Sequence, residues 1–172
     1  MIILVFGLPG TGKSYFARHL QKETDAVLLS TDIIREELNI KGKYDEDTKQ
    51  RVYDEILRRT VKYRKKDKNV IVDGTFHKKK RREGLYRSAV EMKTKIFYIE
   101  IRASEETIKQ RLAENRKYSD ADYNVYCKIK KEFEPETGHH LVLWSGSGST
   151  EEMIFKAKRY IYGHQSDSCP DR

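Results

Sequence analysis

The chain alternates between two hydrophobic patterns. Short, mostly apolar runs are typical of strands buried in a parallel sheet, and polar segments with apolar residues every three or four positions are typical of amphipathic helices. The runs predict strands over residues 2–6, 26–30, 69–72, 94–101 and 141–144. The helical spacing predicts helices over residues 14–23, 78–91 and 120–133, a short helix capped by Thr31 or Asp32 through Leu38, a long one from Asp45 or Asp47 to Lys66, one capped by Ser104, and a last one from Thr150 to Tyr162. This alternation predicts an α/β fold, a five-stranded parallel sheet with helices on both faces.

Length and composition add the organisation of the chain. A length of 172 residues suits one domain, and we expect a single domain over residues 1–162. The polar residues 163–172 are expected to form a flexible C-terminal tail. Cys127 and Cys169 match no metal-binding spacing and are expected to be free thiols. The apolar run 1–6 is too short for a signal peptide or a membrane span, so we expect a cytoplasmic protein with no membrane partner.

The net charge of +8 favours a polyanionic partner, such as nucleic acid, nucleotides or phosphorylated metabolites. A merely soluble basic surface is the alternative, because charge alone specifies no ligand. The sequence gives no indication of an oligomeric state.

The strongest chemical signal follows the first predicted strand. Residues 7–14 read Gly-Leu-Pro-Gly-Thr-Gly-Lys-Ser and fit the P-loop pattern G-x-x-x-x-G-K-[ST] at every fixed position. Glycines let backbone N–H groups converge on phosphates, Lys13 adds a cation for the β- and γ-phosphates, and the Ser14 hydroxyl can hold Mg²⁺. We therefore expect ATP or another nucleoside triphosphate, with Mg²⁺. The expected nucleotide-binding residues are Gly7, Pro9, Gly10, Thr11, Gly12, Lys13, Ser14 and Tyr15.

Ligands of such a sheet lie beyond the carboxyl ends of its strands. Asp32 and Arg35, three positions apart, follow the second strand and share one helix face. Asp32 is our candidate for the catalytic base that takes the proton of an acceptor hydroxyl, with Arg35 binding an anionic group of the acceptor. In the alternative interpretation Asp32 is only an N-cap and Arg35 a surface residue.

The third predicted strand ends in Asp73, where the Mg²⁺-holding acid of a P-loop enzyme belongs. An ordinary Asp-Gly turn is the alternative. Thr75 and Lys78 follow and are expected to bind the acceptor. Lys78 also begins the basic run 78–82, which is equally consistent with binding nucleic-acid phosphates and with a solvated helix face.

Arg111 and Arg116 lie between two predicted helices, in the expected helical lid over residues 111–134. Cations that close over the γ-phosphate stabilise the charge that develops during phosphoryl transfer, and closure excludes water. Arg116 is therefore a catalytic candidate beside Asp32 and Lys13. Arginines on a solvated helix face are the alternative.

With these residues the chain resembles P-loop kinases of the polynucleotide kinase-like group (the AAA_33 and zeta-toxin-related families), which also includes gluconate-type kinases. The segments that carry the resemblance are GLPGTGKS (7–14), STDIIR (30–35), VDGTF (72–76) and RLAENR (111–116). The resemblance implies that Asp32 is the general base, that Arg35 binds an acceptor phosphate, and that Lys13, Ser14 and Arg116 serve the triphosphate and magnesium. It also implies that Arg111 lies against the nucleotide base, with the loop 145–149 on the other side of the base.

Three functions fit the sequence. The first is an ATP-dependent kinase for the 5′-hydroxyl end of RNA or DNA, and the alternative is a kinase for a small hydroxylated molecule such as a sugar, nucleotide or other metabolite. The third is a nucleotide-switched binding module without an acceptor, which the carboxylate after the second strand argues against. Neither the acceptor nor the preferred donor nucleotide follows from the sequence.

Overall fold

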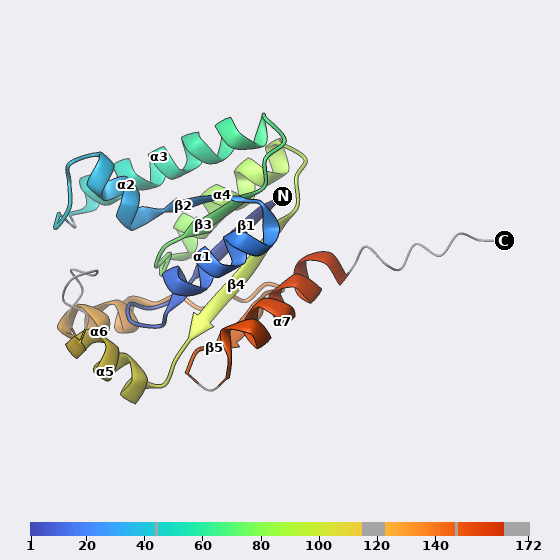
Figure 1. Ribbon diagram of the computed structural model, residues 1–172. Coiled ribbons are helices and arrows are strands. Elements are labelled where there is room, and N and C mark those ends of the chain that lie inside the picture. Colours follow the sequence, from blue (N-terminus) through green and yellow to red (C-terminus); the bar gives the residue numbers. More distant parts are fainter. Residues whose placement is uncertain (44, 115–122, 147, 164–172) are drawn as a thin grey trace.

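A five-stranded parallel sheet forms the centre of the protein. The structure, a computed structural model, describes residues 1–43, 45–114, 123–146 and 148–163 (Figure 1). In these residues the strand order is β2-β3-β1-β4-β5. The strands are β1 (Ile2–Phe6), β2 (Val27–Ser30), β3 (Val70–Asp73), β4 (Ile96–Arg102) and β5 (Leu141–Trp144). Leu4 of β1 pairs with Val72 on one side and with Tyr98 on the other, so the predicted parallel sheet is confirmed.

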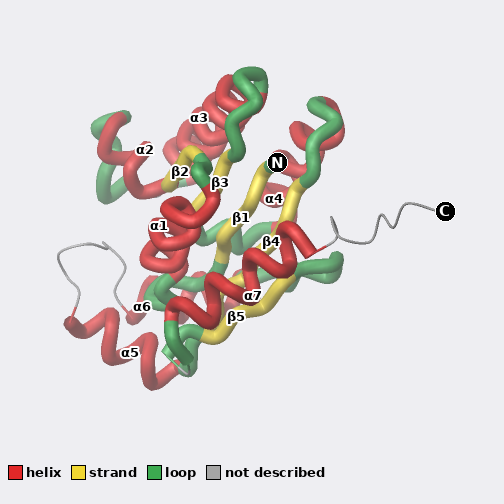
Figure 2. Tube along the Cα trace, turned by 45° about the vertical axis from the view of Figure 1, so that its right-hand side comes forward, coloured by secondary structure: helices red, strands yellow, loops and turns green. Residues whose placement is uncertain are grey.

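Helices cover both faces of the sheet (Figures 1 and 2). They are α1 (Lys13–Thr24), α2 (Thr31–Glu37), α3 (Glu46–Arg64), α4 (Lys79–Glu91), α5 (Glu105–Glu114), α6 (Tyr123–Glu132) and α7 (Thr150–Tyr162). Alternate residues of β1 face opposite sides: Ile3 packs with α1 and α7, and Leu4 with α2, α3 and α4. Because β1 is buried on both faces, its sequence reads as a continuous apolar run.

The predicted helix starts are close to the observed ones. Thr48 N donates 2.8 Å to the Asp45 side chain and Thr107 N donates 3.1 Å to Ser104, so Asp45 and Ser104 act as caps. The last helix is capped by Ser149, not by Thr150 as predicted. Both residues carry a hydroxyl suited to capping, and only the backbone conformation distinguishes them.

The parallel strands bring the loops that follow β1, β2 and β3 to one edge of the sheet. Helices α5 and α6, which contain described parts of the predicted lid, lie beside this edge (Figure 1). The middle of that lid (115–122) and most of the predicted tail (164–172) lie outside the described residues. Within the described ranges, none of the helices has the length and apolar character to cross a bilayer.

Candidate active site

The loop after β1 runs directly into α1 and has the conformation of a phosphate cradle. Gly7 has φ 150° and Gly12 has φ 85°, in the region that favours glycine. A Cβ on Gly7 would lie only 2.3 Å from the carbonyl oxygen of Ile101. The Thr11 hydroxyl donates to the Leu8 carbonyl at 2.8 Å, which closes the loop. The loop therefore places its backbone at a helix N-terminus, where phosphate is favoured.

The side chains at the start of α1 lie on different sides. The Lys13 ammonium donates to the Leu8 carbonyl at 3.5 Å, so it bends back over the loop. Tyr15 is 57% exposed, and its ring lies 4.2 Å from that of His19, one turn further along the helix. A nucleotide contact by Tyr15 therefore stays a prediction.

Asp73, at the end of β3, lies beside this loop and is 1% exposed. Burial raises the pKa of its carboxyl, while the Lys13 ammonium and the Ser14 and Ser30 hydroxyls act to lower it. Within the described residues its Oδ1 is buried and accepts no hydrogen bond. A buried carboxylate oxygen without a partner, close to a hydroxyl, is a set of oxygen ligands that suits Mg²⁺. The predicted metal residues Ser14 and Asp73 thus fit the cation.

Asp32 and Arg35 lie on α2, at the end of β2. The Asp32 side chain is 64% exposed, Arg35 is 11% exposed, and Asp32 Oδ1 lies 3.5 Å from Arg35 Nη1. Ser30 takes the N-cap position of α2 and makes no side-chain cap bond, so neither Thr31 nor Asp32 caps this helix. Asp32 is also near enough to Asp73 to raise the pKa of the Asp73 carboxyl. The Asp32 carboxylate is therefore accessible to solvent and lies near the predicted metal residues.

The loop after β3 lies beside the P-loop. Gly7 N donates to the Thr75 carbonyl at 3.4 Å, which ties the predicted acceptor loop to the phosphate cradle. Phe76 has φ 43°, a left-handed conformation that costs a bulky residue roughly 1–3 kcal/mol. The Phe76 ring is buried against Tyr53, edge to face at 5.1 Å. Surrounding contacts therefore hold a strained turn in the loop that is predicted to bind the acceptor.

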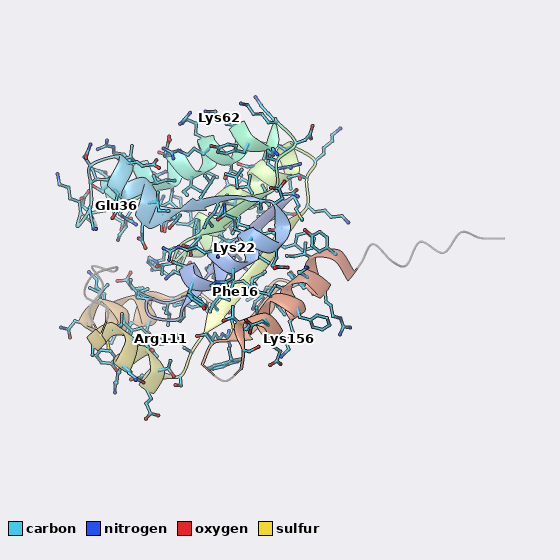
Figure 3. The ribbon with its side chains drawn as sticks, viewed as in Figure 1. Phe16, Lys22, Glu36, Lys62, Arg111 and Lys156 are labelled. Carbon is cyan, nitrogen blue, oxygen red and sulfur yellow. The ribbon has the colours of Figure 1, made fainter. Side chains whose placement is uncertain are left out.

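Arg111, on α5, reaches across to the phosphate loop (Figure 3). Its Nη1 donates to the Ser145 hydroxyl at 2.8 Å and to the Gly10 carbonyl at 3.3 Å. The Ser145 hydroxyl in turn donates to the Thr11 carbonyl at 2.6 Å. The structure thus brings together Arg111, the phosphate loop and the loop after β5, which are remote in sequence. Arg116 lies outside the described residues.

The basic run 78–82 does not form a continuous cationic surface. The Lys78 ammonium lies 3.8 Å from both Glu132 and Glu134. Arg81 stacks over Tyr53 at 4.6 Å and lies 3.5 Å from Glu46. Only Lys79 and Lys80 of the run are exposed. Neither of the two interpretations, a site for nucleic-acid phosphates or a solvated helix face, therefore describes all five residues.

The fifth residue of that run, Arg82, is one that sequence reasoning missed. It is 1% exposed and its Nε donates to Glu136 at 2.9 Å. Arg82 lies three positions before Leu85, which is also buried, and this spacing places both on the inner face of α4. This spacing could have predicted that Arg82 is buried, but Arg82 stands in a run of basic residues and was interpreted together with them.

Comparison with known proteins agrees with this geometry. The family model AAA_33, described as an AAA domain, matches residues 2–135. Among solved structures, a sugar kinase from Janibacter sp. HTCC2649 is 15% identical with a TM-score of 0.75, over 93% of each chain. A gluconokinase from Sinorhizobium meliloti 1021 is 15% identical with a TM-score of 0.71, over 96% of each chain. The APS kinase of Mycobacterium tuberculosis, solved with AMPPNP and APS, is 14% identical with a TM-score of 0.67, over 93% of this chain and 96% of that one. At these identities the structures show that the fold is shared.

Proposed function

The chain belongs to the AAA_33 family of AAA domains, and we propose that it is a P-loop kinase that transfers the γ-phosphate of ATP to a hydroxyl group of a small molecule. The observation that carries this proposal is that two carboxylates lie at the same edge of the sheet. There the exposed carboxylate of Asp32 and the buried carboxylate of Asp73 lie close enough to interact, beside the P-loop. A kinase needs both groups at one place, an acid for the acceptor proton and an acid for the cation.

Each residue then has a distinct role. The P-loop backbone and Lys13 bind the β- and γ-phosphates, and Ser14 and Asp73 would hold Mg²⁺, which when bound offsets the negative charge of the phosphates. Asp32 accepts a hydrogen bond from the acceptor hydroxyl and orients its oxygen toward the γ-phosphorus. It takes the hydroxyl proton as the new P–O bond forms and the bond from the γ-phosphorus to the β,γ-bridging oxygen breaks, which releases ADP. Arg35, which is almost fully buried and lies 3.5 Å from Asp32, binds an anionic group of the acceptor.

The surroundings of the acceptor side favour a small molecule over a nucleic-acid end. A strand of RNA or DNA needs several exposed cations in a row for its phosphates. Here Lys78 faces Glu132 and Glu134, and Arg81 faces Glu46. These carboxylates offset the cations and would repel a polyanion. Likeness to sugar, gluconate and APS kinases agrees with a compact acceptor, and the nucleic-acid prediction has no comparable support.

The test is transfer of label from [γ-³²P]ATP with Mg²⁺ to four classes of acceptor: neutral sugars, sugar acids, nucleosides or nucleotides, and an oligonucleotide with a free 5′-hydroxyl. We expect label on a small molecule, and Asp32→Ala should reduce this transfer about 10²–10⁴-fold. Glu36→Ala is the matched control, because Glu36 lies on the same helix and its side chain pairs with Lys41 at the surface, at 2.8 Å.

Two results would overturn the proposal. Label on the oligonucleotide alone would establish the 5′-hydroxyl kinase that the sequence first suggested. Release of phosphate to water alone, at the same rate in Asp32→Ala and the wild type, would instead indicate a nucleotide-switched module.

A further inference from the structure

Arg82 sits at a junction of three segments and uses its whole guanidinium there. It donates to the carboxylate of Glu136 (2.9 Å) and to the main-chain carbonyls of Phe76 (2.8 Å), His77 (3.4 Å), Glu134 (2.7 Å) and Pro135 (3.2 Å). The guanidinium carbon also lies 5.4 Å from the ring centre of Phe6. These hydrogen bonds join two segments that are remote in sequence, residues 76–77 and residues 134–136, through one side chain.

The first of these segments is the loop after β3, on the acceptor side of the site. Arg82 binds it at the carbonyl of Phe76, the residue with the left-handed backbone. One residue earlier, the Thr75 carbonyl accepts from Gly7 N, and Gly74 N donates to the Val5 carbonyl at 3.3 Å. The conformation that Arg82 holds is therefore connected by hydrogen bonds to the phosphate loop.

The second segment leaves α6 and leads toward β5. Glu134 N donates to the His77 carbonyl at 2.9 Å, and the Glu134 side chain accepts from Lys79 N at 2.6 Å. Just before it, the ring of Phe133 stacks parallel to that of Phe6 at 6.5 Å, next to the P-loop. The end of α6 is thus attached both to the acceptor side and to the strand that carries the phosphate loop.

We propose that Arg82 is a positioning residue for phosphoryl transfer: it fixes the end of α6 and the loop after β3 in one arrangement, so that the acceptor lies in line with the phosphate loop. This inference rests on the proposed kinase function. It assigns Arg82 no contact with substrate. Its effect passes through the backbone of residues 75–77 on one side and residues 133–136 on the other.

Arg82→Lys is the informative substitution. A lysine keeps the positive charge, but its single ammonium cannot donate to both segments as the forked guanidinium of arginine does. Ile154→Ala is the control, since Ile154 is buried in α7 against the opposite face of the sheet and its loss lowers stability without touching the junction. Both variants are compared under conditions where each is folded, as judged by thermal unfolding.

The first readout is hydrogen exchange of the hydrogen-bonded amides of Gly7, Gly74 and Glu134, which needs no acceptor. We expect exchange at all three to rise at least about tenfold in Arg82→Lys, because both segments lose their common anchor. An increase at Glu134 alone, or an equal increase in Ile154→Ala, would overturn the proposal.

The second readout is the kinetics of transfer. We expect kcat to fall about 100-fold in Arg82→Lys with the Kd for ATP unchanged within twofold, because a misplaced acceptor affects the reacting geometry rather than nucleotide binding. A wild-type kcat together with faster exchange would overturn the positioning role and leave the kinase function standing. Absence of transfer in the wild type would count against the kinase function alone, since the exchange experiment still decides whether Arg82 joins the two segments.

Discussion

The hydroxyl of Ser30 donates a hydrogen bond of 3.2 Å to Oδ2 of Asp73, from the end of one strand to the end of its neighbour. This bond engages one oxygen of a buried carboxylate, while Oδ1 accepts no hydrogen bond within the described residues. Ser30 thus holds the Asp73 carboxylate in one orientation. We therefore predict that Oδ1 is the atom that binds Mg²⁺ or a water of its hydration shell.

Asp73→Asn is expected to separate metal binding from folding. Because burial raises the pKa of the Asp73 carboxyl, the unfolded chain loses this proton at a lower pH than the folded chain. The stability of the folded state therefore falls as the pH rises from the pKa of this carboxyl in the unfolded chain to its pKa in the folded chain. Without Mg²⁺ at pH 7, the asparagine variant should therefore melt at an equal or higher temperature than the wild type. It should also lose about 100-fold or more in Mg²⁺-dependent transfer.

Thermal melts with and without Mg²⁺·ADP check this prediction. Mg²⁺ should add to the stabilisation by ADP in the wild type and not in the variant. A wild type that melts at the same temperature with ADP as with Mg²⁺·ADP would contradict a metal role for Asp73.

Gly7→Ala is expected to destabilise the phosphate loop. The positive φ of Gly7 costs an alanine at this position roughly 1–3 kcal/mol, and the added Cβ would lie 2.3 Å from the Ile101 carbonyl oxygen. We expect the melting temperature to fall by more than about 4 °C. Gly163→Ala is the control, since Gly163 has φ −62° and an added Cβ would have no atom of the described residues within 4 Å. An equal, small effect of both substitutions would contradict this account of the loop.

His77 provides a prediction of pH dependence. Burial lowers the pKa of its imidazole below the ordinary value of 6.5, with the Lys78 ammonium acting in the same direction and the Glu132 carboxylate opposing it. As pH falls below about 6.5, the unfolded chain takes up this proton before the folded chain does, so His77 lowers stability toward acid pH. Melting temperatures measured from pH 7 to 5 should fall less steeply in His77→Gln than in the wild type. Parallel curves would show that His77 does not contribute.

Local patterns were sufficient for the sheet and for the phosphate loop. A strand buried on both faces reads as an apolar run, and the P-loop has a fixed spacing because its backbone conformation depends on particular glycines. Helix ends were less certain: Ser149 and Thr150 both carry suitable hydroxyls, and the wrong one of the two was predicted as the cap.

The partners of the basic residues could not be predicted because they come from distant parts of the chain. Arg82 and Glu136 are separated by 54 positions. In the sequence Lys78 looks like a free cation for the acceptor, but α6 and the segment after it bring Glu132 and Glu134 within 3.8 Å of it. The run 78–82 looks uniform in sequence, yet its members differ in burial because a helix turns each to a different side.

The contact between Arg111 and Ser145 yields a prediction about nucleotide affinity. Arg111 Nη1 lies 2.8 Å from the Ser145 hydroxyl, which donates to the Thr11 carbonyl. A charged hydrogen bond contributes about 1.5–3 kcal/mol, so Arg111→Ala should weaken ATP binding about tenfold or more. Lys109→Ala on the same helix is the control, because the contacts of Lys109 within the described residues are with Glu105, at 3.7 Å, and with the Tyr123 ring, at 5.1 Å. Neither contact involves the phosphate loop, so this variant should bind ATP like the wild type.

Ser145→Ala completes a double-mutant cycle, measured by titration calorimetry with ATP. If the arginine binds nucleotide in the orientation that the Ser145 hydroxyl gives it, the loss in Arg111→Ala/Ser145→Ala should be smaller than the sum of the two single losses, by about 0.5–3 kcal/mol. Strictly additive losses would mean that the two side chains act on the nucleotide independently, and that the hydrogen bond between them does not orient Arg111.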